Sequence, residues 1–265
     1  MRWTCLLLVL LIPFAARADW QPRPDWAGLF GEAGVQGTLL VHDERDGAWY
    51  VHDAQRARLA YSPASTFKLF NALVALETGV LADEYEVLRW DGVERSLPVW
   101  NRDHSLASGM RHSVVWLYQD VARRIGQARM DAWIGRVGYG NGDSGGGIDR
   151  FWLKQGALRI NAEQQIAFLQ RLADGTLPFR PQVQEAVRRI ALMEDGTGHR
   201  LHAKTGWAER EGEDDLGWYV GWVERDGARW FFALNIDMPA AGDAAKRIAI
   251  ARRALASLGA LPDAE

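Results

Sequence analysis

The stretch SPASTFKLFNALVAL, residues 62–76, carries the strongest structural signal in the chain and decides how the rest is interpreted. Ser62 is a residue type that caps helix N-termini, and the proline after it is favoured at the first helical position. The apolar run that follows predicts a buried helix ending at about Gly79. Residues three apart lie on one face of a helix. We therefore expect the Ser65 hydroxyl and the Lys68 amine to lie side by side.

Such a pair suits nucleophilic catalysis. A serine hydroxyl is a weak nucleophile until a base removes its proton, and an ordinary lysine is protonated at neutral pH. Burial among Phe67, Leu69 and the apolar run would disfavour the ammonium form and lower the pKa of Lys68. The alternative is a plain helix start with a snorkelling lysine, because S-x-x-K often occurs by chance. The pair needs support from other motifs.

Strand-like runs lie at both ends of the chain. Residues 38–42 and 48–52 predict a hairpin around Asp46-Gly47, a strong turn signal. Three further strands are predicted near the C-terminus, over residues 201–207, 216–223 and 229–236, followed by a helix over residues 242–258. Helical patterns fill the middle, over residues 128–138, from Asn161 with Gln164 as a capping box, and over residues 181–193.

This order predicts an α+β fold. One antiparallel sheet, assembled from both chain termini and flanked by helices, would carry an inserted all-helical lobe. The cleft between the sheet and the lobe is the default binding site. No repeat or linker divides the chain. We therefore expect one catalytic domain over residues 19–265, with two lobes.

The first 18 residues resemble a secretory signal peptide. Arg2 precedes a short apolar run, and Ala16-Arg17-Ala18 offers a cleavage site. Cys5 lies before the apolar run, whereas a lipoprotein cysteine should follow it. No later stretch reaches about 18 uninterrupted apolar residues. We expect a secreted product without a membrane anchor, located in the periplasm of a Gram-negative bacterium.

Charge and composition exclude several functions. Without Arg2 and Arg17, the 31 basic residues fall to 29 against 34 acidic ones, a net charge of −5. An acidic protein is a poor candidate for binding nucleic acid. The absence of cysteine after Cys5 excludes thiol catalysis and cysteine zinc sites. His199 and His202 have a spacing that could suit a metal, but i and i+3 point to opposite faces of a strand, so we expect no metal.

Four more motifs accompany the serine and lysine. They are Ser113-Val114-Val115 at the start of a helical stretch, Tyr139-Gly140-Asn141 after a helix, Phe151-Trp152-Leu153, and Lys204-Thr205-Gly206 on a predicted strand. Each is weak alone: the second could be a helix C-terminal turn and Trp152 a core residue. In this order and spacing, however, the set resembles the class D β-lactamases, or oxacillinases, over nearly the whole chain. Class A enzymes share S-x-x-K and K-T-G but use S-D-N.

The resemblance implies hydrolysis of the β-lactam ring of penicillin-type antibiotics, and hence antibiotic resistance. Ser65 would form the acyl-enzyme. Lys68 would be carboxylated by CO2 to N6-carboxylysine, the general base, so bicarbonate is needed but no other cofactor. Trp152 would donate its indole N–H to the carbamate, and Ser113 would relay a proton to the lactam nitrogen. Val115 would keep the pocket apolar.

Substrate contacts are implied in the same way. Lys204 and Thr205, with Gly206, would meet the side of the β-lactam that carries its carboxylate. The backbone N–H groups of Ser65 and Trp207 would form the oxyanion hole. A family arginine that grips the carboxylate matches Arg247 best, although two further arginines, Arg252 and Arg253, lie nearby.

Alternatives remain open. A penicillin-binding enzyme or a β-lactam sensor would also be acylated at Ser65, but without efficient turnover. The segment around Ser144, G-D-S-G-G, resembles a protease nucleophile, yet it sits in a glycine-rich loop. Trp218 and Trp222 share one face of a strand and could bind sugars, although packing under the sheet is favoured. The sequence leaves open whether the chain is a monomer or a homodimer, and which β-lactams it prefers.

Overall fold

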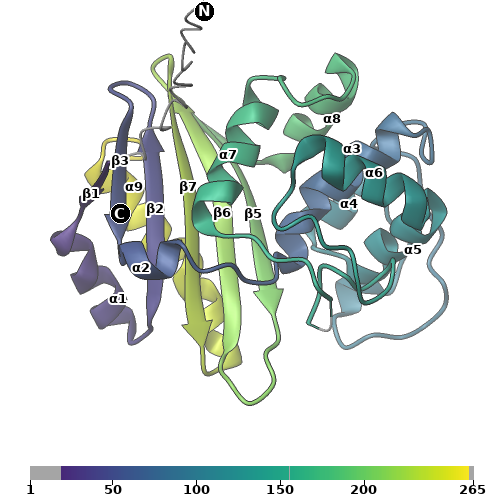
Figure 1. The fold of residues 1–265 in the computed structure, drawn as a ribbon, viewed down its shortest axis with the longest axis horizontal. Helices are drawn as coiled ribbons and strands as arrows, with labels where there is room; N and C mark the ends of the chain where they lie inside the picture. The colour runs from purple at the N-terminus through teal and green to yellow at the C-terminus, as the bar shows by residue number, and fades with distance from the viewer. Residues whose placement is uncertain (1–18, 155, 263–265) are drawn as a thin grey trace, which may run out of the picture.

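A central sheet organises the fold. The computed structural model describes residues 19–154 and 156–262, so the expected signal peptide lies outside the described residues. Within them, seven strands form one sheet in the order β1-β3-β2-β7-β6-β5-β4 (Figure 1). The strands are β1 (Trp20–Pro22), β2 (Gly37–Asp43), β3 (Ala48–His52), β4 (Leu192–Gly196), β5 (His199–Ala208), β6 (Asp215–Arg225) and β7 (Ala228–Met238). The β2–β7 pairing joins the two chain ends, which confirms a sheet assembled from both termini.

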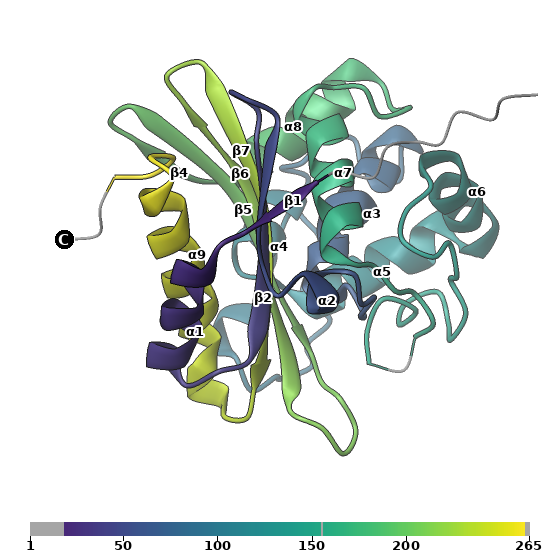
Figure 2. The ribbon, with the colours of Figure 1, turned by 60° about the vertical axis from the view of Figure 1, so that its left-hand side comes forward.

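Helices cover both faces of this sheet. The α-helices are α1 (Ala27–Ala33), α2 (Ala54–Ala57), α3 (Lys68–Glu77), α4 (Leu106–Arg111), α5 (Val115–Ile125), α6 (Gln127–Val137), α7 (Ala162–Ala173), α8 (Pro181–Ala191) and α9 (Lys246–Ser257). α1 and α9 lie against one face, whereas α7 and the rest of the helical lobe lie on the other (Figure 2). None of the helices in the described part of the chain combines the length and the apolar character that a membrane-spanning helix needs.

Two apolar cores result from this layering. The larger one joins the helical lobe to one face of the sheet, and the smaller one lies under α1 and α9. Along β6, Trp218 and Trp222 belong to the larger core, while Tyr219 and Val223 belong to the smaller one, as the alternation of a strand requires. Both tryptophans are fully buried, so their predicted packing under the sheet is confirmed.

Two strands escaped the sequence prediction. β1 has three residues, too few to show alternation, and it pairs in parallel with β3, so the sheet is mixed and not purely antiparallel. The helix predicted over residues 181–193 is two residues too long: α8 ends at Ala191, and β4 begins at Leu192. After β4 the chain turns back through Gly198, which has a φ of 81°. Pairing with β5 replaces the last helical turn.

The start of the helix in residues 62–79 also differs from the prediction. Ser62 does not cap it, because its hydroxyl donates to the carbonyl of Trp152 at 2.8 Å. A 3-10 turn (Ala64–Phe67) comes first, and α3 begins at Lys68. The N–H of Ala64 donates to the same carbonyl, and Ala64 itself adopts a φ of 47°. The loop that carries Trp152 thus shapes the turn that carries Ser65. At α7, by contrast, the capping box of Asn161 and Gln164 is confirmed.

Candidate active site

Ser65 and Lys68 meet at the base of the cleft. The Lys68 Nζ lies 2.6 Å from the Ser65 Oγ, and the lysine is 1% exposed. Burial, with a smaller contribution from the charge of Lys204, holds the pKa of the Lys68 amine well below its usual range. The ring of Tyr118 lies 5.5 Å from the amine, and it brings no negative charge that would stabilise the ammonium form. A lysine in this setting favours its neutral form, which can accept a proton from the serine.

A second serine and lysine lie in the same site, Ser113 from the helical lobe and Lys204 from β5 of the sheet. Ser113 lies two residues before the start of α5 and has a φ of 54°, a conformation that few non-glycine residues adopt. Its Oγ accepts a hydrogen bond of 3.0 Å from Lys204 Nζ, which also donates to the carbonyl of Thr205 at 2.9 Å. Burial and the nearby charge of Arg247 lower the pKa of Lys204 to about 7. The motifs of residues 113 and 204 are therefore brought together, as their order in the sequence suggested.

Arg247 reaches the same site from the far side of the sheet. Its guanidinium donates to the carbonyl of Gly206 and, through Nε, to that of Ala244 at 2.8 Å. A Cβ on Gly217 would lie 2.5 Å from the Arg247 Cδ, so this glycine opens the path of the arginine past β6. Within the described part of the chain, no carboxylate lies within 4 Å of this guanidinium. Burial lowers the pKa of Arg247 to about 10, so it remains a cation at neutral pH.

The two rival arginines have partners elsewhere. Arg252 pairs with Glu194 at 2.6 Å, and Arg253 pairs with Glu32 at 2.6 Å. Neither lines the pocket that contains Ser65, whereas Arg247 does. The structure thus favours Arg247 for a role in this site.

Trp152 contributes a buried donor without an acceptor. Its indole Nε1 finds no hydrogen-bond partner among the described residues, although the side chain is 1% exposed. The ring stacks on Phe67 with centroids 5.1 Å apart, next to Lys68 in the sequence. An unsatisfied buried N–H is costly, so it marks a position where an acceptor is expected.

A pocket of about 600 Å³ opens above these groups. The predicted site residues that line it are Ser65, Ser113, Val115, Thr205, Gly206, Trp207 and Arg247. Lys68, Trp152 and Lys204 are buried behind the lining. Gly206 permits the close approach of β5 to the serine turn, because a Cβ there would lie 3.1 Å from the Pro63 carbonyl oxygen.

Other lining residues escaped the sequence analysis, because none belongs to a recognised motif: Gln119 lies on α5, and the others lie on the segments that connect the longer elements. These lining residues are Leu97, Trp100, His112, Gln119, Arg150, Lys154 and Glu209. Trp207, with 39% of its surface exposed, has its indole fixed by a 2.7 Å hydrogen bond to Asp215. The side chain of Trp207 is thus a wall of the pocket in addition to its predicted backbone role.

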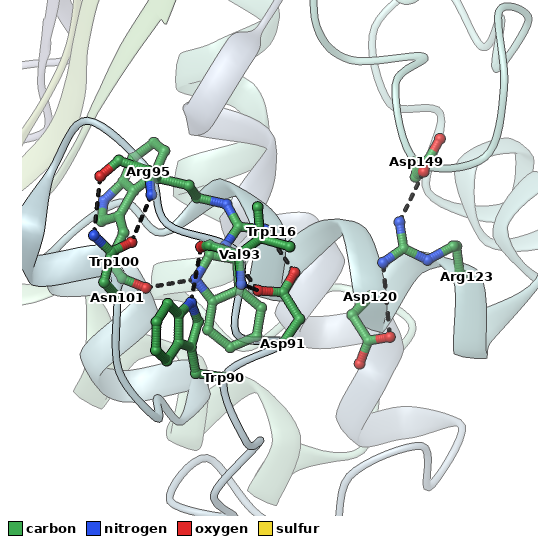
Figure 3. A network of polar contacts seen from close by, with 10 residues as sticks. All are labelled: Trp90, Asp91, Val93, Arg95, Trp100, Asn101, Trp116, Asp120, Arg123 and Asp149. Carbon is green, nitrogen blue, oxygen red and sulfur yellow. Dashed lines mark hydrogen bonds and ion pairs between the residues drawn. The ribbon is translucent and has the colours of Figure 1, made fainter.

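The aromatic wall opposite the sheet is held by a polar network (Figure 3). Trp100 donates its indole N–H to the carbonyl of His112 at 2.9 Å, and its own carbonyl accepts the indole N–H of Trp116 at 2.8 Å. Arg95 joins this network: it forms two hydrogen bonds to the carboxylate of Asp91, and its guanidinium lies 5.5 Å from the Trp116 ring. These contacts hold Trp100 at its place in the pocket wall.

Ser144 and the two histidines occupy other surroundings. The Ser144 hydroxyl donates to Asp131 and accepts from Gln127, so no histidine is its hydrogen-bond partner. His199 contacts Glu194 at 2.7 Å, and His202 contacts the Arg188 carbonyl at 3.0 Å. Over residues 19–154 and 156–262, no group of three His, Cys, Asp or Glu could hold a metal ion.

Comparison with known proteins places this site in a family. A model of the penicillin binding protein transpeptidase domain matches residues 37–256. Beta-lactamase OXA-48 of Klebsiella pneumoniae is 41% identical over 241 residues, which cover 91% of this chain and 90% of that protein. Beta-lactamase OXA-2 of Salmonella typhimurium is 43% identical over 243 residues, or 91% of this chain and 86% of that protein.

Solved structures agree. The class D β-lactamase YbXI from Nostoc matches with a TM-score of 0.86 and 44% identity, covering 89% of this chain and 99% of that one. FUS-1 (OXA-85), a class D β-lactamase from Fusobacterium nucleatum subsp. polymorphum, matches with a TM-score of 0.88 and 33% identity, covering 91% and 100%. The expected β-lactamase-like α+β fold is therefore confirmed, and the chain belongs to the class D β-lactamases.

Proposed function

We propose that this chain hydrolyses the β-lactam ring of penicillin-type antibiotics through an acyl-enzyme on Ser65, and thereby gives resistance to them. The observation that carries the proposal is the 2.6 Å contact between the Ser65 Oγ and the Nζ of a fully buried Lys68, whose pKa is lowered. The names of the relatives, which are β-lactamases at about 40% identity, support the same activity.

Acylation needs a proton to move in two places. Lys68, carboxylated on its amine by CO2, takes the proton of the Ser65 hydroxyl as the serine oxygen attacks the lactam carbonyl carbon. The C–N bond of the ring then breaks, and the nitrogen needs a proton, which Ser113 is placed to relay because Lys204 donates to its hydroxyl. Arg247, with Lys204 and Thr205, binds the carboxylate beside that nitrogen. The backbone N–H groups of Ser65 and Trp207 stabilise the oxyanion.

Deacylation needs a base that activates water after the serine has been esterified. We propose that the same group serves both steps: Lys68 carboxylated on Nζ by CO2, with Trp152 donating its indole N–H to the carbamate. A carbamate would supply an anionic oxygen base. Two features support the assignment: burial favours the neutral amine that reacts with CO2, and the Trp152 Nε1 is a buried donor in need of an acceptor.

The carbamate predicts a dependence on bicarbonate. In CO2-depleted buffer, added bicarbonate should raise turnover several-fold, and the effect should grow as the pH falls, because protonation of the Lys68 amine opposes carboxylation. The measurement is the steady-state rate of nitrocefin hydrolysis at several pH values. Lys68→Ala, which has no amine to carboxylate, is the matched control and should not respond to bicarbonate. A response to bicarbonate that is flat across pH would contradict the assignment.

Turnover distinguishes a lactamase from a β-lactam sensor or a penicillin-binding enzyme. We expect continuous hydrolysis of a penicillin, with an adduct on Ser65 that appears and disappears in intact-mass spectra. A single burst with a lasting adduct would favour the sensor or transpeptidase alternative. A panel with oxacillin, a cephalosporin and a carbapenem would define the substrate range. We further propose secretion to the periplasm, supported by the leader-like pattern of residues 1–18.

A further inference from the structure

The walls of the pocket carry more positive charge than one substrate carboxylate requires. The charged lining residues are three cations, Arg150, Lys154 and Arg247, and one carboxylate, Glu209. His112 also lines the pocket, but burial, together with the charges of Arg102, His104 and Arg111, lowers its pKa, so it adds little to this positive charge. Because the chain as a whole is acidic, this local surplus is specific to the site.

Two of these cations belong to a different wall from Arg247. Arg247 comes from α9, behind the sheet, and contacts Gly206. Arg150 and Lys154 lie on the loop between α6 and α7, on the side of the helical lobe, and Leu153 between them also lines the pocket. If Arg247 holds the carboxylate of the β-lactam core, the charges on the loop remain available to another anionic group.

Arg150 is only loosely paired. Its Nε lies 3.8 Å from Asp149, but that carboxylate is held by Arg123 at 2.8 Å (Figure 3). Arg123 in turn lies 3.8 Å from Asp120 on its own helix. The charge of Asp149 is therefore largely neutralised by Arg123, and Arg150 retains 58% of its side-chain surface for contact with solvent or a ligand.

Lys154 is similar. Its Nζ lies 3.9 Å from Glu209, beyond hydrogen-bond distance, and the glutamate side chain is 70% exposed. Exposed pairs of this kind contribute little and exchange readily. Two cations and one carboxylate thus remain on these outer walls, a net charge of +1 beyond Arg247.

We propose that Arg150 and Lys154 form a second anion subsite, which favours β-lactams that carry an additional carboxylate on their acyl side chain. The inference rests on the proposed β-lactamase function and names a substrate class for it. Glu209 opposes the subsite, because it lines the same pocket with the opposite charge. The attraction between these partly exposed cations and a substrate carboxylate speeds the capture of the substrate. It should therefore raise kcat/KM, and the effect should weaken as salt is added.

The test uses penicillins that differ at one carbon. Benzylpenicillin has a hydrogen on its side-chain carbon, carbenicillin a carboxylate and ampicillin an ammonium group. The readout is the ratio of kcat/KM for carbenicillin to that for benzylpenicillin, compared between variants. The bulk of the carboxyl group is the same for every variant, so a change in the ratio reports the charge of the protein.

Removing the cations should lower that ratio. We expect Arg150→Gln and Lys154→Gln to reduce it about threefold each, and the double variant about tenfold, in line with partly exposed charge pairs. Glu209→Gln should raise it about threefold, and the ampicillin ratio should move in the opposite direction throughout. In the wild-type protein, the carbenicillin ratio should fall as NaCl is raised from about 0.05 to 0.5 M.

Arg200→Gln is the matched control. Arg200 is 50% exposed and loosely paired, at 3.7 Å from Asp195 and 3.6 Å from Glu224, much like Arg150. It lies seven residues from Trp207 along β5, roughly 23 Å from the pocket. We expect this variant to keep the wild-type ratio.

The outcomes separate the two proposals. If benzylpenicillin is turned over and the double variant keeps the wild-type carbenicillin ratio within twofold, the subsite is overturned and the β-lactamase function stands. If Ser65 is acylated without turnover, hydrolysis is overturned, and the ratio of the acylation rates, measured by intact mass, tests the subsite. Failure of both penicillins to acylate Ser65 would overturn both.

Discussion

Replacement of Lys68 by alanine is expected to lower β-lactam turnover by about a hundred- to ten-thousandfold, the usual contribution of general-base catalysis. The lysine Nζ contacts the Ser65 hydroxyl at 2.6 Å, and the described residues place no other basic side chain in hydrogen-bond contact with that oxygen. Without the amine, the serine keeps its proton, and water has no base to activate it after acylation. Steady-state hydrolysis and intact-mass detection of the adduct would measure the two effects separately.

Two further variants make this result specific. Ser65→Ala should abolish the adduct altogether, whereas Lys68→Ala should either fail to form it or trap it. Ser144→Ala, which removes the hydroxyl of the protease-like segment, should leave hydrolysis unchanged. Near-normal turnover by Lys68→Ala would refute the assignment of the base.

Replacement of Lys68 should lower turnover but raise the stability of the fold. Burial disfavours the charged form of Lys68, so the folded state binds this proton less tightly than the unfolded chain does. Stability therefore rises with pH between the lowered pKa and the unfolded value of about 10.5. Lys68→Met, which keeps the bulk without the charge, should have a higher Tm than the CO2-depleted wild type at pH 7. This gain should shrink as the pH approaches 10. An inactive but stabilised protein would distinguish loss of a base from misfolding.

Local patterns predicted much of the fold and the reacting groups. The alternation in β5, β6 and β7 and the capping box of α7 depend on neighbours in the sequence, so they could be recognised there. The S-x-x-K spacing placed Ser65 and Lys68 together even though a 3-10 turn, and not the predicted helix, carries the serine. In both geometries, residues three apart lie close together.

The remaining features depend on contacts between distant segments. Ser62 satisfies the carbonyl of Trp152 instead of capping a helix, which no local pattern could indicate. Ser113, with its positive φ, meets Lys204 of β5 only in the folded chain. Arg150 and Lys154 enter the pocket because their loop folds over it. Such residues become visible only when the two lobes are assembled.

Replacement of Arg247 by alanine is expected to raise the KM for penicillins about a hundredfold, with a much smaller change in kcat, which corresponds to loss of one buried, charge-assisted contact. The guanidinium contacts only backbone carbonyls among its hydrogen-bond partners within residues 19–154 and 156–262, so its charge is available to a substrate carboxylate. Arg253→Ala is the control, because Arg253 lies on the same helix but pairs with Glu32. Equal KM values for the wild type and Arg247→Ala would contradict the assignment.

The same variant should alter the pH dependence of binding through Lys204. Burial lowers the pKa of Lys204 to about 7, and the positive charge of Arg247 contributes to the shift. Above that pH the wild-type protein loses one of its two carboxylate-binding charges, so KM should rise. Removing Arg247 relieves the repulsion and raises the pKa of Lys204, so the break in a plot of KM against pH should move to higher pH. A break that stays in place or moves lower would show that the two cations do not act on one carboxylate.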